Sequence, residues 1–223
     1  MLNRLSMLRL RDKTPLAQGD HRALYAVESD PTLVVKVIRA TPAPPRNPVK
    51  RLKRICHRVF PLSQDRSLLR EYAAYMRLKR AQLERTDEPP VADWAGPVAT
   101  DIGLGMLYEK IGPEDGTIGP SVSALARSGK LPEYLPLLND FVRRLFEWEI
   151  RANDVNRGNI VLGTRHGREQ FVLVDGLGDS HFIPVRTWFG WWNEYSLNKR
   201  LAKVAARTHL TWDPNERRFL LKD

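Results

Sequence analysis

The hydrophobic positions along the chain change their spacing from one part to the next. Residues 15–27 and 32–38 are expected to form strands. The second has a β-branched apolar run broken by one lysine, and Asp30-Pro31 supplies a turn before it. Residues 67–83 and 133–151 instead carry apolar side chains at helical spacing. The pattern therefore predicts two strands near the start and two long helices further on.

Shorter apolar stretches predict the remaining elements. Residues 105–111 predict a strand, and residues 159–162 and 171–174 predict two more, joined by a hairpin-like turn over 163–167. The chain from Thr187 onward is expected to be helical. Strands thus dominate the first part and helices the second, which predicts an α+β protein with two lobes, an N-lobe over 1–111 and a C-lobe over 112–223.

Charge and cysteine content narrow the class of protein. The 223 residues carry a net charge of +10, so the surface favours anionic partners without choosing among them. No apolar run approaches the roughly 20 residues that a transmembrane helix needs, and the start of the chain lacks the pattern of a secretory signal. Cys56 is the only cysteine, so no internal disulfide can form. These features predict a cytoplasmic protein.

Residues 40–64 form a basic, proline-rich insertion. Four prolines lie between Pro42 and Pro48, and no acidic residue occurs in this segment. Its cationic residues include Arg46, Lys50, Arg51, Lys53 and Arg54. We interpret it as a solvated loop or short helix, with an anionic lipid or nucleic-acid surface as the alternative partner.

The strongest chemical signal follows the second predicted helix. Asp154 is followed five residues later by Asn159, which opens an apolar strand, and Asp175 ends the next apolar strand. This is the order and spacing of a kinase catalytic loop and metal-binding aspartate. Asp154 is expected to orient the attacking hydroxyl, and Asn159 and Asp175 to bind Mg²⁺ through hard oxygen ligands. The alternative is that Asp154 and Asn156 only form a turn and that Asp175-Gly176 is an ordinary turn.

Residues nearer the start of the chain agree with this interpretation. Lys36 interrupts an apolar strand, where a lysine is costly without a partner, and Glu71 lies on the mostly apolar face of a helix. We expect a Lys36–Glu71 ion pair that directs Lys36 onto the phosphates of ATP. An edge-strand lysine and a surface glutamate are the alternatives.

Two further segments are candidates for nucleotide binding. Gly19 and Arg22 lie where a phosphate-covering loop is expected, although only one of the usual three glycines is present. A plain hairpin turn is the alternative there. The backbone groups of Glu109 and Ile111 are expected to hold the adenine edge, on the basis of their place in the chain order alone.

Several segments together resemble a known family. They are Pro15-Leu16-Ala17-Gln18-Gly19, Lys36, Arg70-Glu71, Asn159-Ile160-Val161-Leu162, and Ile183-Pro184-Val185-Arg186-Thr187-Trp188 after Asp175-Gly176. In these the sequence resembles the bacterial YrbL-like family, called PhoP regulatory network proteins, from about Pro15 to Val204. The resemblance implies a protein-kinase-like fold more securely than it implies a reaction.

The sequence also departs from standard protein kinases. Some members of the YrbL-like family lack the acidic residue at the position of Asp154, whereas this chain has it. Ala152-Asn153 replaces the usual His-Arg before that residue, and no Ala-Pro-Glu follows Asp175. Regulation by a phosphorylated activation loop is therefore not expected.

Two functional hypotheses follow from these features. The first is an ATP- and Mg²⁺-dependent transfer of phosphate to a hydroxyl of an unknown acceptor, which could be a small molecule, a lipid-linked sugar or a protein. The alternative is a catalytically weak pseudokinase that acts as a binding module in a bacterial stress or two-component network.

The tryptophans and histidines add little to this picture. Residues 188–192 hold three tryptophans with basic residues beyond, which suggests core packing or, as the alternative, a membrane-interface helix. The five histidines are not spaced as zinc ligands with each other or with Cys56, so no structural zinc is expected.

Overall fold

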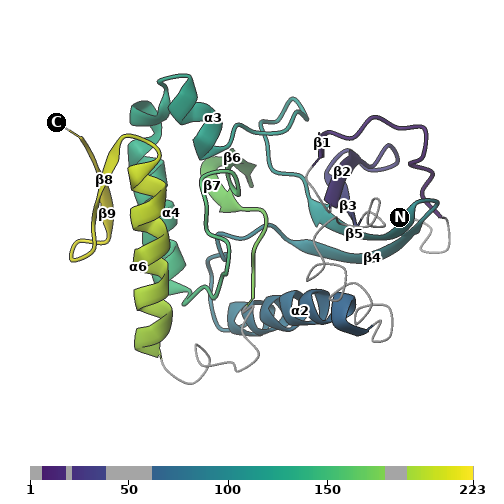
Figure 1. Cartoon of the computed structure of the whole chain (residues 1–223), viewed down its shortest axis with the longest axis horizontal. Helices are drawn as coiled ribbons and strands as arrows, with labels where there is room; N and C mark the ends of the chain where they lie inside the picture. The colour runs from purple at the N-terminus through teal and green to yellow at the C-terminus, as the bar shows by residue number, and fades with distance from the viewer. Residues whose placement is uncertain (1–6, 19–21, 39–61, 179–189, 223) are drawn as a thin grey trace, which may run out of the picture. The chain divides into compact units, whose positions relative to one another are not determined.

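The computed structural model describes residues 7–18, 22–38, 62–178 and 190–222. Within them the chain forms two compact units (Figure 1). The first comprises residues 1–63 and 92–110, and the second comprises residues 64–91 and 111–223. The chain therefore enters the second unit at residue 64, returns to the first at residue 92 and enters the second again at residue 111. A single functional boundary at residue 111 stays a prediction.

The first unit is built on one antiparallel sheet. Its strands are β1 (Ala17–Gln18), β2 (Arg22–Ala26), β3 (Leu33–Ile38), β4 (Trp94–Thr100) and β5 (Gly103–Glu109), in the spatial order β1-β2-β3-β5-β4. The predicted strand at 105–111 begins and ends two residues earlier than expected. Val35 and Val37 have no exposed surface and pack with Tyr25, Val27 and Leu107 in the core of this unit. Because side chains alternate along a strand, Lys36 lies on the opposite face.

Strand β4 was not predicted from the sequence. It contains Gly96 and Pro97, two residues that disfavour an interior strand. The strand is nevertheless tolerated because it lies at the end of the sheet order, where the missing N–H of Pro97 costs no ladder hydrogen bond. The register shifts between Trp94 and Gly96, and the backbone of Gly96 is left-handed there.

The second unit holds the helices α3 (Val122–Arg127), α4 (Leu135–Glu147) and α6 (Gly190–Ala206), and α2 (Leu62–Gln82) from residue 64 onward. It also contains the hairpin of β6 (Ile160–Arg165) and β7 (Arg168–Leu173), and a second hairpin of β8 (Leu210–Asp213) and β9 (Arg218–Leu221). An antiparallel sheet in one unit and helices in the other confirm the predicted α+β class. Helix α2 begins five residues before the predicted start.

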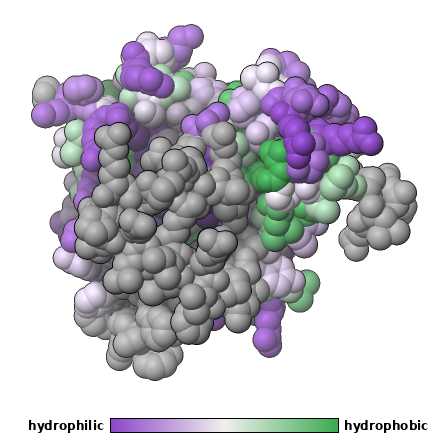
Figure 2. Space-filling view, turned by 45° about the vertical axis from the view of Figure 1, so that its right-hand side comes forward, coloured by the Kyte–Doolittle hydropathy of each residue, from purple (hydrophilic) through white to green (hydrophobic). Residues whose placement is uncertain are grey.

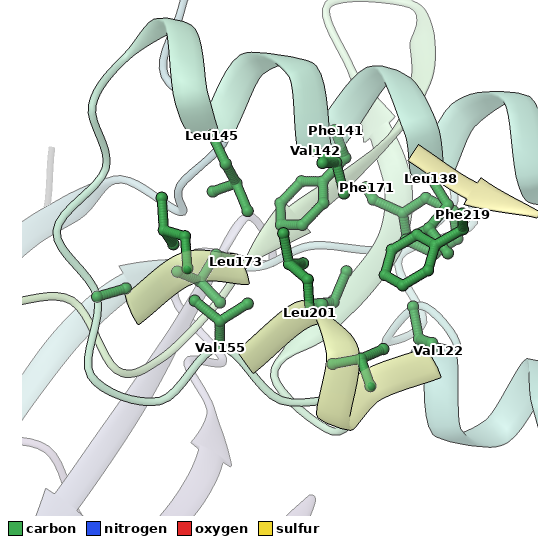
Figure 3. Packing of buried hydrophobic residues seen from close by; sticks show 14 of the residues in the cluster. Val122, Leu138, Phe141, Val142, Leu145, Val155, Phe171, Leu173, Leu201 and Phe219 are labelled. Atoms are coloured by element: carbon green, nitrogen blue, oxygen red, sulfur yellow. The ribbon is translucent and has the colours of Figure 1, made fainter. Parts of the chain in front are cut away.

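The core of the second unit joins segments that are far apart in the chain. Phe141 and Leu145 of α4, Phe171 and Leu173 of β7 and Leu201 of α6 have 0 or 1% exposed surface and point toward one another (Figure 3). The helical spacing in the sequence predicted the α4 face correctly. The helix itself is shorter than predicted, because residues 131–134 form a 3₁₀ turn before it and Glu149 adopts a positive φ of 46° after it.

Two predictions about turns and termini are corrected. The turn between β6 and β7 is only His166-Gly167, both with left-handed backbones, and β6 runs through Gly163 to Arg165. The end of the chain is not helical throughout, since residues 210–221 form the β8–β9 hairpin. Its Phe219 is fully buried, and the Asn139 side chain both donates to and accepts from the Phe219 backbone, at 3.1 and 2.7 Å.

The described surface is mostly hydrophilic in the view of Figure 2, with a compact hydrophobic patch. Among the described residues, no helix has the length and apolar character that crossing a membrane requires. The basic insertion over 40–64 falls almost entirely outside the described residues, as do Gly19 and the segment 183–188.

Candidate functional site

The loop that carries Asp154 is held by the segment that carries Asp175. Ala152 and Leu177 form an antiparallel bridge. The Asn153 N–H donates to the Gly176 carbonyl at 2.8 Å, and the Gly178 N–H donates to the Arg151 carbonyl at 2.8 Å. The two segments are more than 20 residues apart in the sequence, so tertiary pairing, and not local spacing alone, brings the two aspartates together.

Gly176 lets these segments approach closely. Its φ of +86° is a conformation that side chains rarely adopt, and a Cβ at this position would lie 2.7 Å from the Cβ of Asp154 and 3.0 Å from its backbone. The Gly176 N–H donates to the Asp175 carboxylate at 2.8 Å. The glycine after Asp175 is thus required by geometry.

The loop itself is shaped by two asparagines. The Asn156 side-chain oxygen accepts from the N–H groups of Gly158 and Asn159 at 2.7 and 3.2 Å, which closes a tight local turn. The Asn159 amide group donates to the Asp154 carbonyl at 3.0 Å and to the Asp154 carboxylate at 3.1 Å. Asp154 and Asn159, which the sequence predicted as partners in one site, therefore lie in direct contact.

Val155 fixes which way the loop faces. Its side chain is only 3% exposed and points into the core beside Leu173 and Leu201 (Figure 3), whereas Asp154 next to it is exposed. Anchoring one residue in the core and exposing its neighbour presents the Asp154 carboxylate to solvent. A role for Val155 was not predicted, although an apolar residue inside a polar loop was the available signal.

Asn159 and Asp175 have the chemistry of a Mg²⁺ site. The Val174 N–H donates to the Asn159 carbonyl at 2.9 Å, so Asn159, just before β6, lies beside the residue that precedes Asp175. The Asn159 amide nitrogen donates to Asp154, so the amide oxygen of Asn159 points away from Asp154. Amide and carboxylate oxygens are hard ligands that suit Mg²⁺. Among the described residues, no group of three His, Cys, Asp or Glu side chains could hold a metal ion by itself.

Lys36 occupies the middle of the sheet in the first unit. It pairs with Leu24 of β2 and Met106 of β5, and its Nζ lies 4.6 Å from the centre of the Tyr108 ring. Such a distance allows a cation–π interaction. Glu71 on α2 is 9% exposed, so it is a buried acid and not the surface glutamate of the alternative interpretation. The Lys36–Glu71 ion pair itself stays a prediction.

Other residues predicted to bind nucleotide make backbone contacts within the protein. The Glu109 N–H donates to the Asp93 carbonyl at 2.9 Å, and the Ile111 carbonyl accepts from the Gly119 N–H at 3.0 Å. Arg22 is half-buried in β2, opposite Ile38. Their roles in binding nucleotide stay predictions, and Gly19 lies outside the described residues.

The structure also reveals a pocket that the sequence did not predict. Asp154 lines a cavity of about 480 Å³ together with residues of helix α6. Its cationic side chains are Arg157, Lys199, Arg200, Lys203 and Arg207. Lys199, Lys203 and Arg207 follow one another at intervals of four residues, which places the two lysines on one side of α6 and Arg207 just after its end. This spacing was the available signal.

The segment 85–91 connects α2 to the rest of the second unit. The Trp148 indole donates to the Asp87 carboxylate at 2.8 Å, and Arg144 donates to the Glu88 carbonyl at 2.6 Å. Hydrogen bonds from Arg85 and, to a lesser extent, from Trp148 lower the pKa of Asp87 to about 2, against the opposing effect of burial. Burial lowers the pKa of the Arg144 guanidinium.

These features define an α+β protein in which Asp154, Asn159 and Asp175 occur in the order that protein kinases show. The chain belongs to the family of the PhoP regulatory network protein YrbL, whose model matches residues 8–209. It is 25% identical over 190 residues to the uncharacterized protein YrbL of Escherichia coli K12, across 83% of this chain and 80% of that protein. The same values describe its similarity to the Shigella flexneri YrbL.

Solved structures similar to this chain include protein kinase domains. Two are crystal structures of mutants of the PknI kinase domain from Mycobacterium tuberculosis. The first is 17% identical with a TM-score of 0.47, and the match covers 90% of this chain and 74% of that one. The second is 15% identical with a TM-score of 0.46, over 87% and 73% of the two chains.

Proposed function

We propose that the protein binds ATP with Mg²⁺ and transfers the γ-phosphate to a hydroxyl group of an acceptor. The observation that carries the proposal is the hydrogen-bonded arrangement of Asp154, Asn159 and the Asp175-Gly176 segment. Structural turns alone would explain the Asn156 turn, but they would not explain why an exposed carboxylate lies in contact with the candidate metal ligand Asn159.

Each residue has a distinct role in this proposal. Asp154 orients the acceptor hydroxyl, and Asn159 and Asp175 hold Mg²⁺, which would neutralise charge on the phosphates. Lys36 contacts the phosphates and Glu71 positions Lys36. The reaction forms a bond between the acceptor oxygen and the γ-phosphorus. It breaks the bond between the γ-phosphorus and the β–γ bridging oxygen of ATP, which leaves with ADP. The hydroxyl proton passes to the Asp154 carboxylate.

A thermal-shift measurement with ATP and Mg²⁺ tests nucleotide binding. A ligand at 100 times its Kd adds about 2.7 kcal/mol of stability, which for a chain of this size raises the Tm by roughly 5 °C or more. The Asp175→Asn variant should lose the Mg²⁺-dependent part of the shift, whereas Asp12→Asn, at an exposed site outside the loop, should keep it. Absence of any shift at millimolar nucleotide would contradict the proposal.

A pseudokinase that binds nucleotide without transferring phosphate is the second candidate. It is favoured by Ala152-Asn153, which replaces the His-Arg pair of standard kinases. The two candidates differ in turnover, because a positioned general base contributes roughly 10²- to 10⁴-fold to a rate. The rate of ADP formation should therefore fall by about that factor in Asp154→Asn. Equal rates in the wild type and the variant, across sugar, lipid and protein acceptors, would favour the pseudokinase.

A further inference from the structure

The pocket beside Asp154 has an unusual charge distribution. Five cationic side chains line it, and Asp154 is the only carboxylate among its described lining residues. Three of the five, Lys199, Lys203 and Arg207, are exposed. Within the part of the chain that the structure describes, none of these three has a carboxylate within ion-pair distance.

Helix stability does not account for this arrangement. Like charges four residues apart on a helix destabilise it by about 0.2–0.5 kcal/mol per pair. The helix dipole favours cations in the last turn, which explains Lys203, but Lys199 and Arg200 lie further from the end. The opposite side of α6 already anchors the helix, since Leu197 and Leu201 are buried at 1 and 0% exposure. The cationic side therefore requires another explanation.

The contacts of Arg157 join the two sides of the pocket. Its guanidinium donates to the Arg207 carbonyl at 3.0 Å, and its own carbonyl accepts from the Ser123 N–H at 2.8 Å. The Asp154 loop, helix α3 and the end of α6 are thus connected through one residue. A ligand held by α6 would lie in the same pocket as the Asp154 carboxylate.

The size and lining of the pocket indicate the kind of ligand. A volume of about 480 Å³ falls in the range of small-molecule sites, which is roughly 300–1,000 Å³. Trp192 and Tyr195 also line it and are 40 and 59% exposed, with ring centres 6.2 Å apart. Aromatic faces suit the C–H surface of a ring-shaped polyol, while Lys and Arg suit phosphate groups.

We infer that this pocket binds the acceptor, and that the acceptor is a polyol that already carries phosphate. The inference rests on the proposed function and names the substrate class. The cations of α6 hold the existing phosphate, which leaves a hydroxyl of the polyol facing Asp154. The transfer then follows the bond changes given above, with ADP as the leaving group. The phosphate-bearing polyol is either a free sugar phosphate or a lipid headgroup.

Calorimetric titration with inositol hexakisphosphate tests the pocket apart from catalysis, because this probe has phosphates and no hydroxyl to accept another. We expect saturable binding to the full chain at about 0.15 M salt. Replacing both Lys199 and Lys203 by Gln should weaken it roughly 10-fold, since each loses a solvent-exposed ion pair with the probe. The matched control replaces the exposed Lys130 and Lys222 by Gln and should stay within about twofold, since it removes the same charge outside the pocket.

Equal losses in the two double variants would mean that only the net charge matters, and would overturn the inference. Asp154→Asn supplies an independent measurement. Removing the single carboxylate should tighten binding of the probe about threefold, as expected when like-charge repulsion disappears. Unchanged or weaker binding would place the anion away from Asp154, which also overturns the inference.

Two further measurements assign the source of the ligand and separate the two proposals. The first is co-sedimentation with vesicles of about 30 mol% phosphatidylglycerol. If the Lys199 and Lys203 double variant loses co-sedimentation and the control double variant keeps it, the ligand is a lipid headgroup. Competition by glucose 6-phosphate in the titration assigns a soluble sugar phosphate. The ATP and Mg²⁺ thermal shift of the wild type is measured in parallel. Its absence alongside pocket-dependent probe binding would reject the kinase proposal and leave an anion-binding site.

Discussion

The Asp154 loop and strand β3 position their candidate functional side chains by different means. Lys36 is positioned by regular pairing with β2 and β5, and its neighbours Val35 and Val37 bury the other face. Asp154 lies in an irregular loop that depends on long-range hydrogen bonds and on one glycine. The strand should therefore tolerate a change of its functional residue, whereas the loop should not tolerate changes in its supporting residues.

Gly176→Ala should show the largest effect of this difference. The left-handed backbone and the 2.7 Å approach to Asp154 both oppose a Cβ, so we expect a loss of about 2–5 kcal/mol in the free energy of unfolding. Chemical denaturation measures it. Gly129→Ala is the matched control, because Gly129 also has a positive φ, +73°, but open space around it. Similar losses in the two variants would show that the close approach adds nothing.

Lys36→Met should leave the fold intact and weaken nucleotide binding. Methionine retains most of the apolar stem, so the Tm without ligand should change little. Loss of the cation should lower ATP affinity about 10-fold, which is the effect of removing one charge-assisted hydrogen bond. Titration calorimetry measures the affinity, with Lys130→Met as the control. An unfolded variant would instead assign Lys36 a structural role in the sheet.

Asn156→Ala should have a smaller effect on the loop. It removes the oxygen that accepts from Gly158 and Asn159, at a cost of about 1 kcal/mol in stability. Asn215 is exposed, and its side chain makes no hydrogen bond to another described residue, so Asn215→Ala serves as the control. If the catalytic geometry of the loop depends on this turn, the rate of phosphate transfer should fall by more than the loss of folded protein accounts for. A loss of stability with an unchanged rate would contradict that dependence.

Asp87→Asn should have the smallest effect, and only above about pH 4, because the Asp87 side chain is 44% exposed and solvent screens its charge. The folded pKa of about 2 lies below the ordinary value of 3.8, so the ionised carboxylate stabilises the fold above about pH 4. This contribution is lost as the pH falls from about 4 to about 2. The difference in Tm between wild type and variant should therefore shrink over that range. A difference that stays constant with pH would indicate that the charge of Asp87 is not involved.

Local patterns in the sequence predicted much of the fold. Helical spacing located α4 and its buried face, a β-branched run located β3, and short apolar runs located β6 and β7. The strand expected within residues 15–27 contains β2. These predictions hold because burial of one face requires a matching period in the sequence. Strand β4 escaped prediction because its Gly96 and Pro97 are acceptable only at the edge of a sheet, and a sequence alone does not reveal an edge.

The candidate site divides in the same way. The sequence by itself determined the spacing from Asp154 to Asn159 and the position of Asp175 after an apolar strand, because the chemistry requires these residue types in this order. Only the tertiary structure decided that Gly176 must approach Asp154 and that α6 brings its cations to the same pocket. The two segments of that pocket are more than 30 residues apart, and such contacts arise from packing around a shared core, which no local pattern encodes.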